Sequence, residues 1–212
     1  MLQQARQRRF VGRVAQLQQF ESMLAGGPQR VLYLYGPAGI GKSALLEQFA
    51  LRARALGREI VSIDGREHTV TEEMLAETVS ALSTQTDAVL LIDGYELLAA
   101  HDEWFRAHAL PELAADAVVV LASREPPSVE WRTDLAWAEV AVRSPLEPLP
   151  DDDALLLLQA ANVPGDEREH LLRLGRGHPL ALALLADARR LGPLPERLGD
   201  APDVVSALTA RI

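Results

Sequence analysis

The fold is decided by residues 31–43, which read VLYLYGPAGIGKS. The first five are apolar or aromatic, as expected of a short strand that is buried on both faces of a parallel sheet. A glycine, four further residues and then Gly41-Lys42-Ser43 follow, and a helical pattern runs from Lys42 to about Leu56, before Gly57. A strand, a glycine-rich loop and a helix in this order predict a phosphate-binding loop.

Each residue type in this loop has a chemical reason. Glycines allow backbone angles and a close approach that a Cβ would prevent, so that successive N–H groups can surround phosphate oxygens at the positive end of the helix. Lys42 would bring an ammonium group to the β- and γ-phosphates, and the Ser43 hydroxyl would complete a Mg²⁺ shell. We therefore expect ATP or ADP with Mg²⁺, bound by Gly36, Pro37, Ala38, Gly39, Ile40, Gly41, Lys42, Ser43 and Ala44.

The distribution of lysine supports this prediction. The chain contains 21 lysines and arginines, and Lys42 is the only lysine among them. The alternative is a glycine-rich turn that matches by chance, which average residue usage predicts in about one per cent of chains of this length. The strand and helix that flank the loop make the chance explanation weaker still.

Composition excludes several classes of protein. The chain has no cysteine, which excludes disulfides, thiolate metal sites and cysteine nucleophiles. Its formal net charge of −9 disfavours direct nucleic-acid binding, and the basic start that contains Arg6, Arg8, Arg9 and Arg13 is expected to be a solvated arm. No secretory signal is visible at residues 1–10 and no run is long and apolar enough to span a membrane. We expect a cytoplasmic protein without a membrane partner.

Strand and helix patterns alternate through the first part of the chain and then give way to helices. Short apolar runs indicate strands, and apolar residues at helical spacing indicate helices. Thr71 is the expected N-cap of one helix, with acidic residues in its first turn. The expected strands are residues 31–35, 59–63, 88–92, 117–122 and 138–142, and the expected helices are residues 14–24, 42–56, 71–82, 102–114, 151–161, 166–174 and 179–191.

This order predicts an α/β fold, a P-loop NTPase with a five-stranded, mainly parallel sheet between helices, followed by a small helical subdomain. Three prolines near residue 145 mark the boundary, and Asp151 is the expected cap of the first helix beyond it. The expected domains are residues 1–145, which bind the nucleotide, residues 146–200, which are helical, and residues 201–212, the truncated start of a following domain.

Carboxylates follow the strand at 88–92. Asp93 ends this strand at the edge where open α/β sheets bind ligands, so we expect it to hold Mg²⁺ beside Ser43, either directly or through a ligand of the ion. The alternative is a turn aspartate before Gly94. Many ATPases place an acid directly after such an aspartate, and here that position is Gly94. Glu96 is the nearest carboxylate that could act as general base, and the alternative is a solvated loop residue.

Two further positions carry charge or a titratable ring. Arg124 follows the strand at 117–122 and could contact the γ-phosphate, or it could simply pair with Glu125 or Glu130. His178 precedes Pro179 at the start of an apolar helix, where proline is favoured on structural grounds alone. Such a histidine is more often a cap or a surface residue than a ligand.

Taken together, these motifs resemble the STAND class of signal-transduction ATPases, which are relatives of the AAA+ and apoptotic ATPases, and most of all the nucleotide-binding module of bacterial multidomain regulators. The resemblance extends from Phe10 to about Arg211. It rests on the phosphate loop and on Phe10-Val11-Gly12-Arg13, Leu91-Ile92-Asp93-Gly94-Tyr95-Glu96, Ala122-Ser123-Arg124 and Gly177-His178-Pro179-Leu180-Ala181-Leu182, in that order.

The resemblance implies roles for the matched residues. Val11, Gly12 and Arg13 would lie near the adenine, and Pro179 would close over the base or ribose. Arg124 would act as a sensor of the γ-phosphate.

The resemblance also implies how the strands and domains are arranged. In the family, the strand that ends here at Ala122 usually lies between the phosphate-loop strand and the strand of Asp93. Residues 201–205 resemble the start of the winged-helix domain that normally follows.

We therefore expect a slow ATPase that works as an ATP/ADP switch within a larger signalling or transcriptional regulator. Its partners would be the missing C-terminal output or sensor domains, and it could form a homo-oligomer in the ATP state. Two alternatives stay open. One is a self-contained enzyme such as a small-molecule kinase, with Arg168, Arg173 and Arg176 as candidate phosphate ligands. The other is a scaffold that holds ADP permanently.

Overall fold

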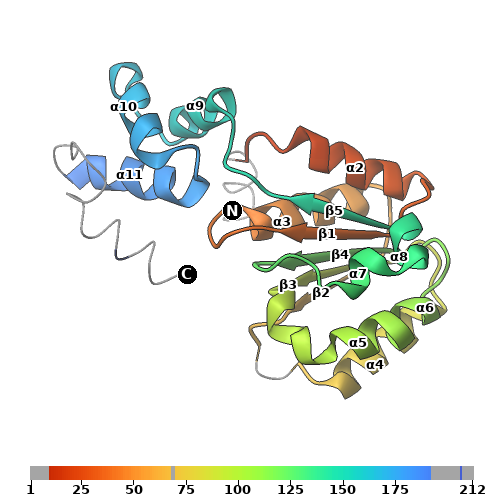
Figure 1. The fold of residues 1–212 in the computed structure, drawn as a ribbon. Helices are drawn as coiled ribbons and strands as arrows, with labels where there is room; N and C mark the ends of the chain where they lie inside the picture. The colour runs from red at the N-terminus through yellow and green to blue at the C-terminus, as the bar shows by residue number, and fades with distance from the viewer. Residues whose placement is uncertain (1–9, 68–69, 192–205, 207–212) are drawn as a thin grey trace. The chain divides into compact units, whose positions relative to one another are not determined.

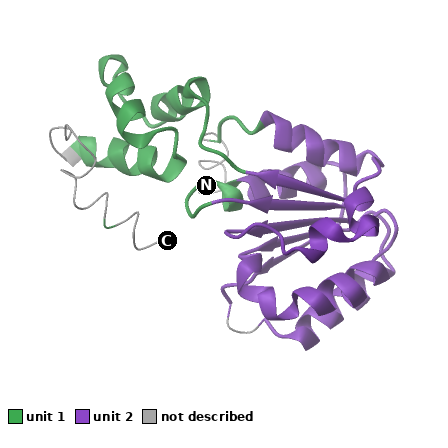
Figure 2. Cartoon of the chain, viewed as in Figure 1, with its two compact units in different colours: residues 1–13, 37–44, 146–212 green, residues 14–36, 45–145 purple. Residues whose placement is uncertain are grey.

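A computed structural model describes residues 10–67, 70–191 and 206. The contacts divide the chain into two compact units (Figure 2). The sheet unit comprises residues 14–36 and 45–145, and the helical unit comprises residues 1–13, 37–44 and 146–212. The expectations for Arg6, Arg8, Arg9 and residues 201–212 concern positions outside the described residues, except for Ser206.

The sheet has the strand order β2-β3-β4-β1-β5, and all neighbouring pairs are parallel. This confirms the expected α/β fold and places β4 between the phosphate-loop strand β1 and β3. The carboxyl ends of the strands are in register, with Asp64 opposite Asp93, Asp93 opposite Ala122, and Tyr35 opposite Ser123. The strands are β1 (Val31–Tyr35), β2 (Ile60–Asp64), β3 (Val89–Asp93), β4 (Val118–Ser123) and β5 (Ala141–Pro145).

The fifth strand lies later in the chain than expected. The sequence pattern predicts residues 138–142, but the strand spans Ala141–Pro145 because residues before it form helix α8 (Leu135–Val140). Asp134 caps this helix through its side chain, which accepts a hydrogen bond of 2.9 Å from the Ala136 N–H. The cap fixes where the helix begins, and the strand starts only after the helix ends.

Helices cover both faces of the sheet (Figure 1). Alternate strand residues such as Tyr33 and Ile92 pack against one group of helices, whose buried residues include Leu75, Phe105 and Trp131. That group is α4 (Glu72–Ser83), η1 (Tyr95–His101), α5 (Asp102–Trp104), η2 (Phe105–Ala109), α6 (Leu110–Glu112), α7 (Glu130–Thr133) and α8, while α2 (Val14–Leu24) and α3 (Lys42–Ala55) cover the other face.

Two helix predictions of the sheet unit can be compared closely. Thr71 is the N-cap of α4, as predicted, and its side-chain oxygen accepts a hydrogen bond of 3.2 Å from the Met74 N–H. The helix expected at residues 102–114 is present, but it contains a π-helical turn, Phe105–Ala109, between two short α-helical pieces. Such turns are uncommon, and apolar spacing alone does not reveal them.

The helical unit is built from α9 (Asp151–Ala160), α10 (Gly165–Gly175) and α11 (Pro179–Leu191), which share a core that includes Leu158, Leu171, Leu182 and Leu185. Asp151 is the cap that the sequence predicts for α9, but the structure places Pro150 at the N-cap and Asp151 inside the first turn. There its charge, with those of the next two aspartates, favours the positive end of the helix dipole.

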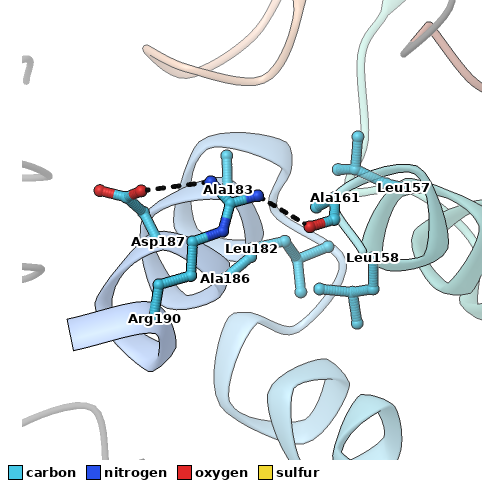
Figure 3. Close-up of a pocket in the computed structure, with 8 residues that line it drawn as sticks. All are labelled: Leu157, Leu158, Ala161, Leu182, Ala183, Ala186, Asp187 and Arg190. Carbon is cyan, nitrogen blue, oxygen red and sulfur yellow. Dashed lines mark hydrogen bonds and ion pairs between the residues drawn. The ribbon is translucent and has the colours of Figure 1, made fainter. Parts of the chain in front are cut away.

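A shallow hollow of about 120 Å³ lies between α9 and α11 (Figure 3). Apolar residues line most of it, and the Arg190 guanidinium at its rim donates to the Ala161 carbonyl at 3.0 Å and pairs with Asp187 at 3.8 Å. The hollow is smaller than the pockets of about 300 Å³ or more that hold drug-sized ligands. The described helices include none with the length and apolar character needed to cross a membrane.

Candidate functional site

The phosphate loop joins β1 to α3, as the sequence predicts. Gly39 and Gly41 adopt φ angles of 74° and 104°, a region that residues with a Cβ rarely enter. Lys42 is only 8 % exposed, and its Nζ donates a hydrogen bond of 3.0 Å to the Pro37 carbonyl of the same loop. Ser43 is exposed at the first turn of α3. The lysine is therefore held within the loop, while the serine lies at the surface.

Three consecutive carbonyls of the loop accept hydrogen bonds from the rest of the helical unit. Ala38 O lies 3.1 Å from His178 Nε2, Gly39 O accepts from the Leu180 N–H at 3.3 Å, and Ile40 O accepts from Arg13 Nη2 at 2.9 Å. The donors come from both ends of the described chain. The loop therefore has its shape fixed by the helical unit as well as by its own glycines.

Gly39 makes the closest packing contact of the loop. A Cβ at this position would lie 2.7 Å from two carbon atoms of the Leu180 side chain and 3.1 Å from the His178 ring. Glycine is thus required at position 39 both by the φ angle and by the approach of helix α11.

Arg13, which the family resemblance places near the adenine, ties the loop to the helical unit. Besides Ile40 O, its guanidinium donates to the Glu147 carbonyl at 2.8 Å, and burial lowers its pKa. Its neighbour Gly12 lies so close to α9 that a Cβ would be 2.3 Å from the Asp153 carboxylate, and Val11 packs against the helical core. Contact of these residues with adenine stays a prediction.

His178 has one defined neutral tautomer. Because Ala38 O can only accept, Nε2 must carry the hydrogen, and Nδ1 accepts from the Ala181 N–H at 3.4 Å. Partial burial lowers the pKa of this imidazole from its usual 6.5. Pro179 is the first residue of α11 and stands between the two residues that bond the loop.

This arrangement predicts a pH dependence of stability. The unfolded imidazole titrates near 6.5 and the folded one lower, so the unfolded state binds more protons as the pH falls through this interval. We expect the free energy of unfolding to decrease as the pH falls below about 6.5, and to level off once the folded imidazole is protonated. His178→Gln should remove this component while keeping a donor for Ala38.

Urea titrations of both proteins at pH 8 to 5 measure the effect, and the difference between wild type and variant cancels the contribution of the other histidines. A difference that is constant across this range would contradict the assignment.

The carboxyl edge of the sheet unit carries a second group of charged residues. Asp93 is 18 % exposed, and its Oδ2 accepts a hydrogen bond of 2.9 Å from Arg66 Nη2. The same guanidinium donates to both oxygens of Asp64, at 2.7 and 2.8 Å. These bonds lower the pKa of Asp64 and raise that of Arg66. Arg66 therefore joins the carboxylates that end two neighbouring strands.

Glu96 and Arg124 are brought together by the sheet. The Glu96 Oε2 accepts the Arg124 N–H at 2.9 Å, and Oε1 lies 3.3 Å from Arg124 Nε. Glu96 is thus a partner of Arg124. Ser123, just before it, is fully buried, and its carbonyl accepts the Gly36 N–H at 3.2 Å. This bond fixes the start of the phosphate loop at the same edge of the sheet.

A buried network supports the segment that carries Glu96. The Asp102 Oδ1 accepts hydrogen bonds of 2.8 Å from both the Tyr95 hydroxyl and the Trp131 Nε1. Ser128 donates to the other carboxylate oxygen at 3.3 Å. Tyr95 precedes Glu96, and the other two donors follow Arg124 in the chain. Asp102 therefore links the segment after β3 to the segment after β4.

Replacing Asp102 tests this link. Tyr95 and Trp131 are 3 % and 2 % exposed, so Asp102→Ala would leave two buried donors without an acceptor. We expect a loss of about 2–4 kcal/mol in the free energy of unfolding, and a smaller loss for Asp102→Asn, which keeps one acceptor oxygen. Urea unfolding provides the measurement. A loss below about 0.5 kcal/mol for the alanine variant would show that the network contributes little.

The structure thus assembles the predicted residues in two groups, one around the loop and one at the carboxyl edge. Sequence reasoning misses Arg66 and Asp102. The Asp64-Gly65-Arg66 sequence directly after a strand is the available signal for Arg66, whereas nothing local identifies Asp102. Arg168, a candidate phosphate ligand in the kinase alternative, donates to the Val163 carbonyl at 2.9 Å.

Solved structures with the same fold include the RuvB Holliday junction branch migration motor of Thermotoga maritima. It has a TM-score of 0.57 at 17 % identity, with coverage of 95 % of this chain and 70 % of that chain. The replication initiator DnaA bound to AMPPCP and single-stranded DNA has a TM-score of 0.59 at 16 % identity, with coverage of 82 % and 61 %. At these sequence identities, the similarity to the two structures shows a shared fold and nothing about function. No curated protein sequence matches the chain.

The sequence of residues 10–125 matches the family described as an ATPase domain predominantly from Archaea. The match covers more than half of the 212 residues and includes the phosphate loop, Asp93, Glu96 and Arg124. The chain therefore belongs to this family of ATPase domains, and it carries a nucleotide-binding P-loop on an AAA+-type fold.

Proposed function

We propose that this protein is an ATP/ADP switch with slow ATP hydrolysis, in which the phosphate loop reports the bound nucleotide to the helical unit. The observation that carries the proposal is the set of hydrogen bonds from Arg13, His178 and Leu180 to three consecutive loop carbonyls. These bonds would change with the loop geometry, because their donors lie outside the loop.

A nucleotide can act as a switch only if it binds one conformation of the protein more tightly than another. A ligand shifts a conformational equilibrium only by as much as it binds one state better than the other. ATP and ADP differ in the γ-phosphate, which Lys42 and Arg124 would contact in the ATP state. In the structure the Lys42 ammonium donates a hydrogen bond to the Pro37 carbonyl. If the ammonium moved to a phosphate, this bond would break. The Pro37 carbonyl directly precedes the three loop carbonyls that accept hydrogen bonds from Arg13, His178 and Leu180.

We propose that a Mg²⁺ ion binds together with the nucleotide. Within residues 10–67 and 70–191, no group of three or more carboxylate or histidine side chains could hold a metal ion without other ligands. A Mg²⁺ ion in a nucleotide site does not need such a group, because most of its ligands are phosphate oxygens and water. Ser43 and Asp93 would supply the protein oxygens, and Asp93 already holds a cationic partner, Arg66. The ion would neutralise charge on the phosphate oxygens.

Glu96 is the proposed general base. It would take a proton from a water molecule as the water oxygen attacks the γ-phosphorus and the bond to the ADP oxygen breaks. In the structure both Glu96 oxygens face Arg124. If this pairing has to break before Glu96 accepts a proton, hydrolysis would be slow. The same movement would release Arg124 toward the γ-phosphate.

Hydrogen–deuterium exchange tests the switch. We expect ATP and ADP, each at saturation with Mg²⁺, to give different exchange rates at residues 178–185 of the helical unit. The variant His178→Ala should bind both nucleotides but show a smaller difference, because one of the three bonds to the loop is lost. Equal exchange in the two nucleotide states of the wild type would contradict the switch, even if both nucleotides bind.

The wider context is also a proposal. The ordered motifs of the STAND resemblance support a role within a cytoplasmic signalling or transcriptional regulator, with output or sensor domains as partners and an oligomeric ATP state. RuvB and DnaA, the proteins of similar fold, are described as a Holliday junction branch migration motor and a replication initiator. The charge of −9 on this chain disfavours binding of DNA.

A further inference from the structure

Arg66 holds a position that a bound metal ion would need. Its guanidinium contacts Asp93 Oδ2 at 2.9 Å, and Asp93 is the carboxylate proposed to accept Mg²⁺. The other oxygen of Asp93 already accepts the Gly94 N–H at 3.0 Å. A metal ion that binds Asp93 at Oδ2 would therefore lie beside the guanidinium, and the two cations would repel each other.

The arginine is anchored beside this carboxylate rather than placed there by chance. Asp64 binds the guanidinium through both oxygens, at 2.7 and 2.8 Å, and also accepts the Arg66 N–H at 3.0 Å. Such two-point pairing fixes the orientation of a guanidinium. The carboxylate of Asp64 thus keeps the arginine next to Asp93 even when its contact with Asp93 is broken.

The backbone between the two residues is fixed as well. The Gly65 N–H donates to the Asp93 carbonyl at 2.8 Å, and a Cβ on Gly65 would lie 2.5 Å from the Gly94 carbonyl oxygen. Only glycine fits this approach. The turn that presents Arg66 is therefore attached directly to the strand end that presents Asp93.

We propose that Arg66 is a tethered cation that competes with the divalent metal for Asp93, and so sets the metal concentration at which the metal–nucleotide complex forms. This inference rests on the proposed function. Without nucleotide, Arg66 pairs with Asp93 as well as with Asp64. When metal arrives with the nucleotide phosphates, the arginine gives up Asp93 and stays bound to Asp64. The exposure of the Arg66 side chain, 57 %, leaves it room for this movement.

Binding of Mn²⁺, a paramagnetic substitute for Mg²⁺, tests the competition directly. The free Mn²⁺ signal is measured by electron paramagnetic resonance in the presence of the full-length chain saturated with ADP. We expect Arg66→Ala to bind Mn²⁺ about fivefold more tightly than wild type. A factor of about five is the upper end of the contribution that an ion pair between partly exposed side chains makes. Arg52→Ala, which removes a surface ion pair with Glu21, is the matched control and should equal wild type.

A conservative variant separates direct contact from general charge. Lysine keeps the positive charge but cannot bind Asp64 through a planar fork while reaching Asp93, so Arg66→Lys should bind Mn²⁺ more tightly than wild type. An Arg66→Ala variant with unchanged or weaker Mn²⁺ binding would overturn the proposal, and an Arg66→Lys variant equal to wild type would overturn the direct contact.

The proposed function has a separate readout in the same samples. ADP binding is measured by calorimetry both in EDTA and with saturating Mg²⁺. If no protein binds ADP under either condition, the proposed function fails. If all bind ADP equally but the Mn²⁺ affinities of wild type and the Arg66 variants agree, only the competition fails.

Discussion

Lys42→Ala is expected to weaken ATP binding by about two orders of magnitude and to remove measurable hydrolysis. The ammonium is the only lysine charge in the chain, and it lies at the first residue of α3, beside the loop. The loss of its charge-assisted hydrogen bonds to the β- and γ-phosphates should cost roughly 3 kcal/mol of binding free energy. The fold should persist, because the carbonyl that Lys42 bonds belongs to a loop held by three other donors.

Equilibrium binding of a fluorescent ATP analogue, together with phosphate release, measures both effects. Arg54→Ala is the matched control, since Arg54 is an exposed cation on the same helix and its loss changes the net charge equally. If Lys42→Ala binds ATP as tightly as this control, the phosphate loop is not the nucleotide site.

Glu96→Gln is expected to keep ATP binding within about twofold and to slow phosphate release by at least about a hundredfold, the usual contribution of a general base. Glutamine has nearly the same shape and can still accept the Arg124 N–H, which now lies 2.9 Å from the Glu96 carboxylate. It cannot accept the proton from water. The variant should therefore accumulate ATP on the protein.

Single-turnover measurements with excess protein separate hydrolysis from product release in this variant. Glu103→Gln, a change of the same type at an exposed position on α5, is the control. If phosphate release by Glu96→Gln proceeds at the rate of the control, Glu96 only pairs with Arg124 and another group activates the water.

The parts of the site that lie close together in sequence could be predicted without the structure. The strand, loop and helix around Lys42 are local, and each residue type follows from the chemistry of phosphate binding. The position of β4 between β1 and β3 follows from the family resemblance and is confirmed. The position of Asp93 at the end of a strand could be predicted from the apolar run that precedes it.

The remaining parts depend on contacts between distant segments. Arg66 meets Asp93 only because Asp64 and Asp93 are in register on neighbouring strands, and a register is not visible in one strand alone. Asp102 bonds Trp131 across a separation of 29 residues. For His178 the sequence alone favours a cap or a surface residue. It does accept the Ala181 N–H, but its other nitrogen bonds the phosphate loop, 140 residues away.

Calorimetric titration of the wild-type chain with ATP and with ADP, in the presence of Mg²⁺, tests whether the phosphate loop binds a nucleotide. We predict saturable binding of one nucleotide per chain for both ligands. Absence of binding for both would contradict the assignment of the phosphate loop as the nucleotide site.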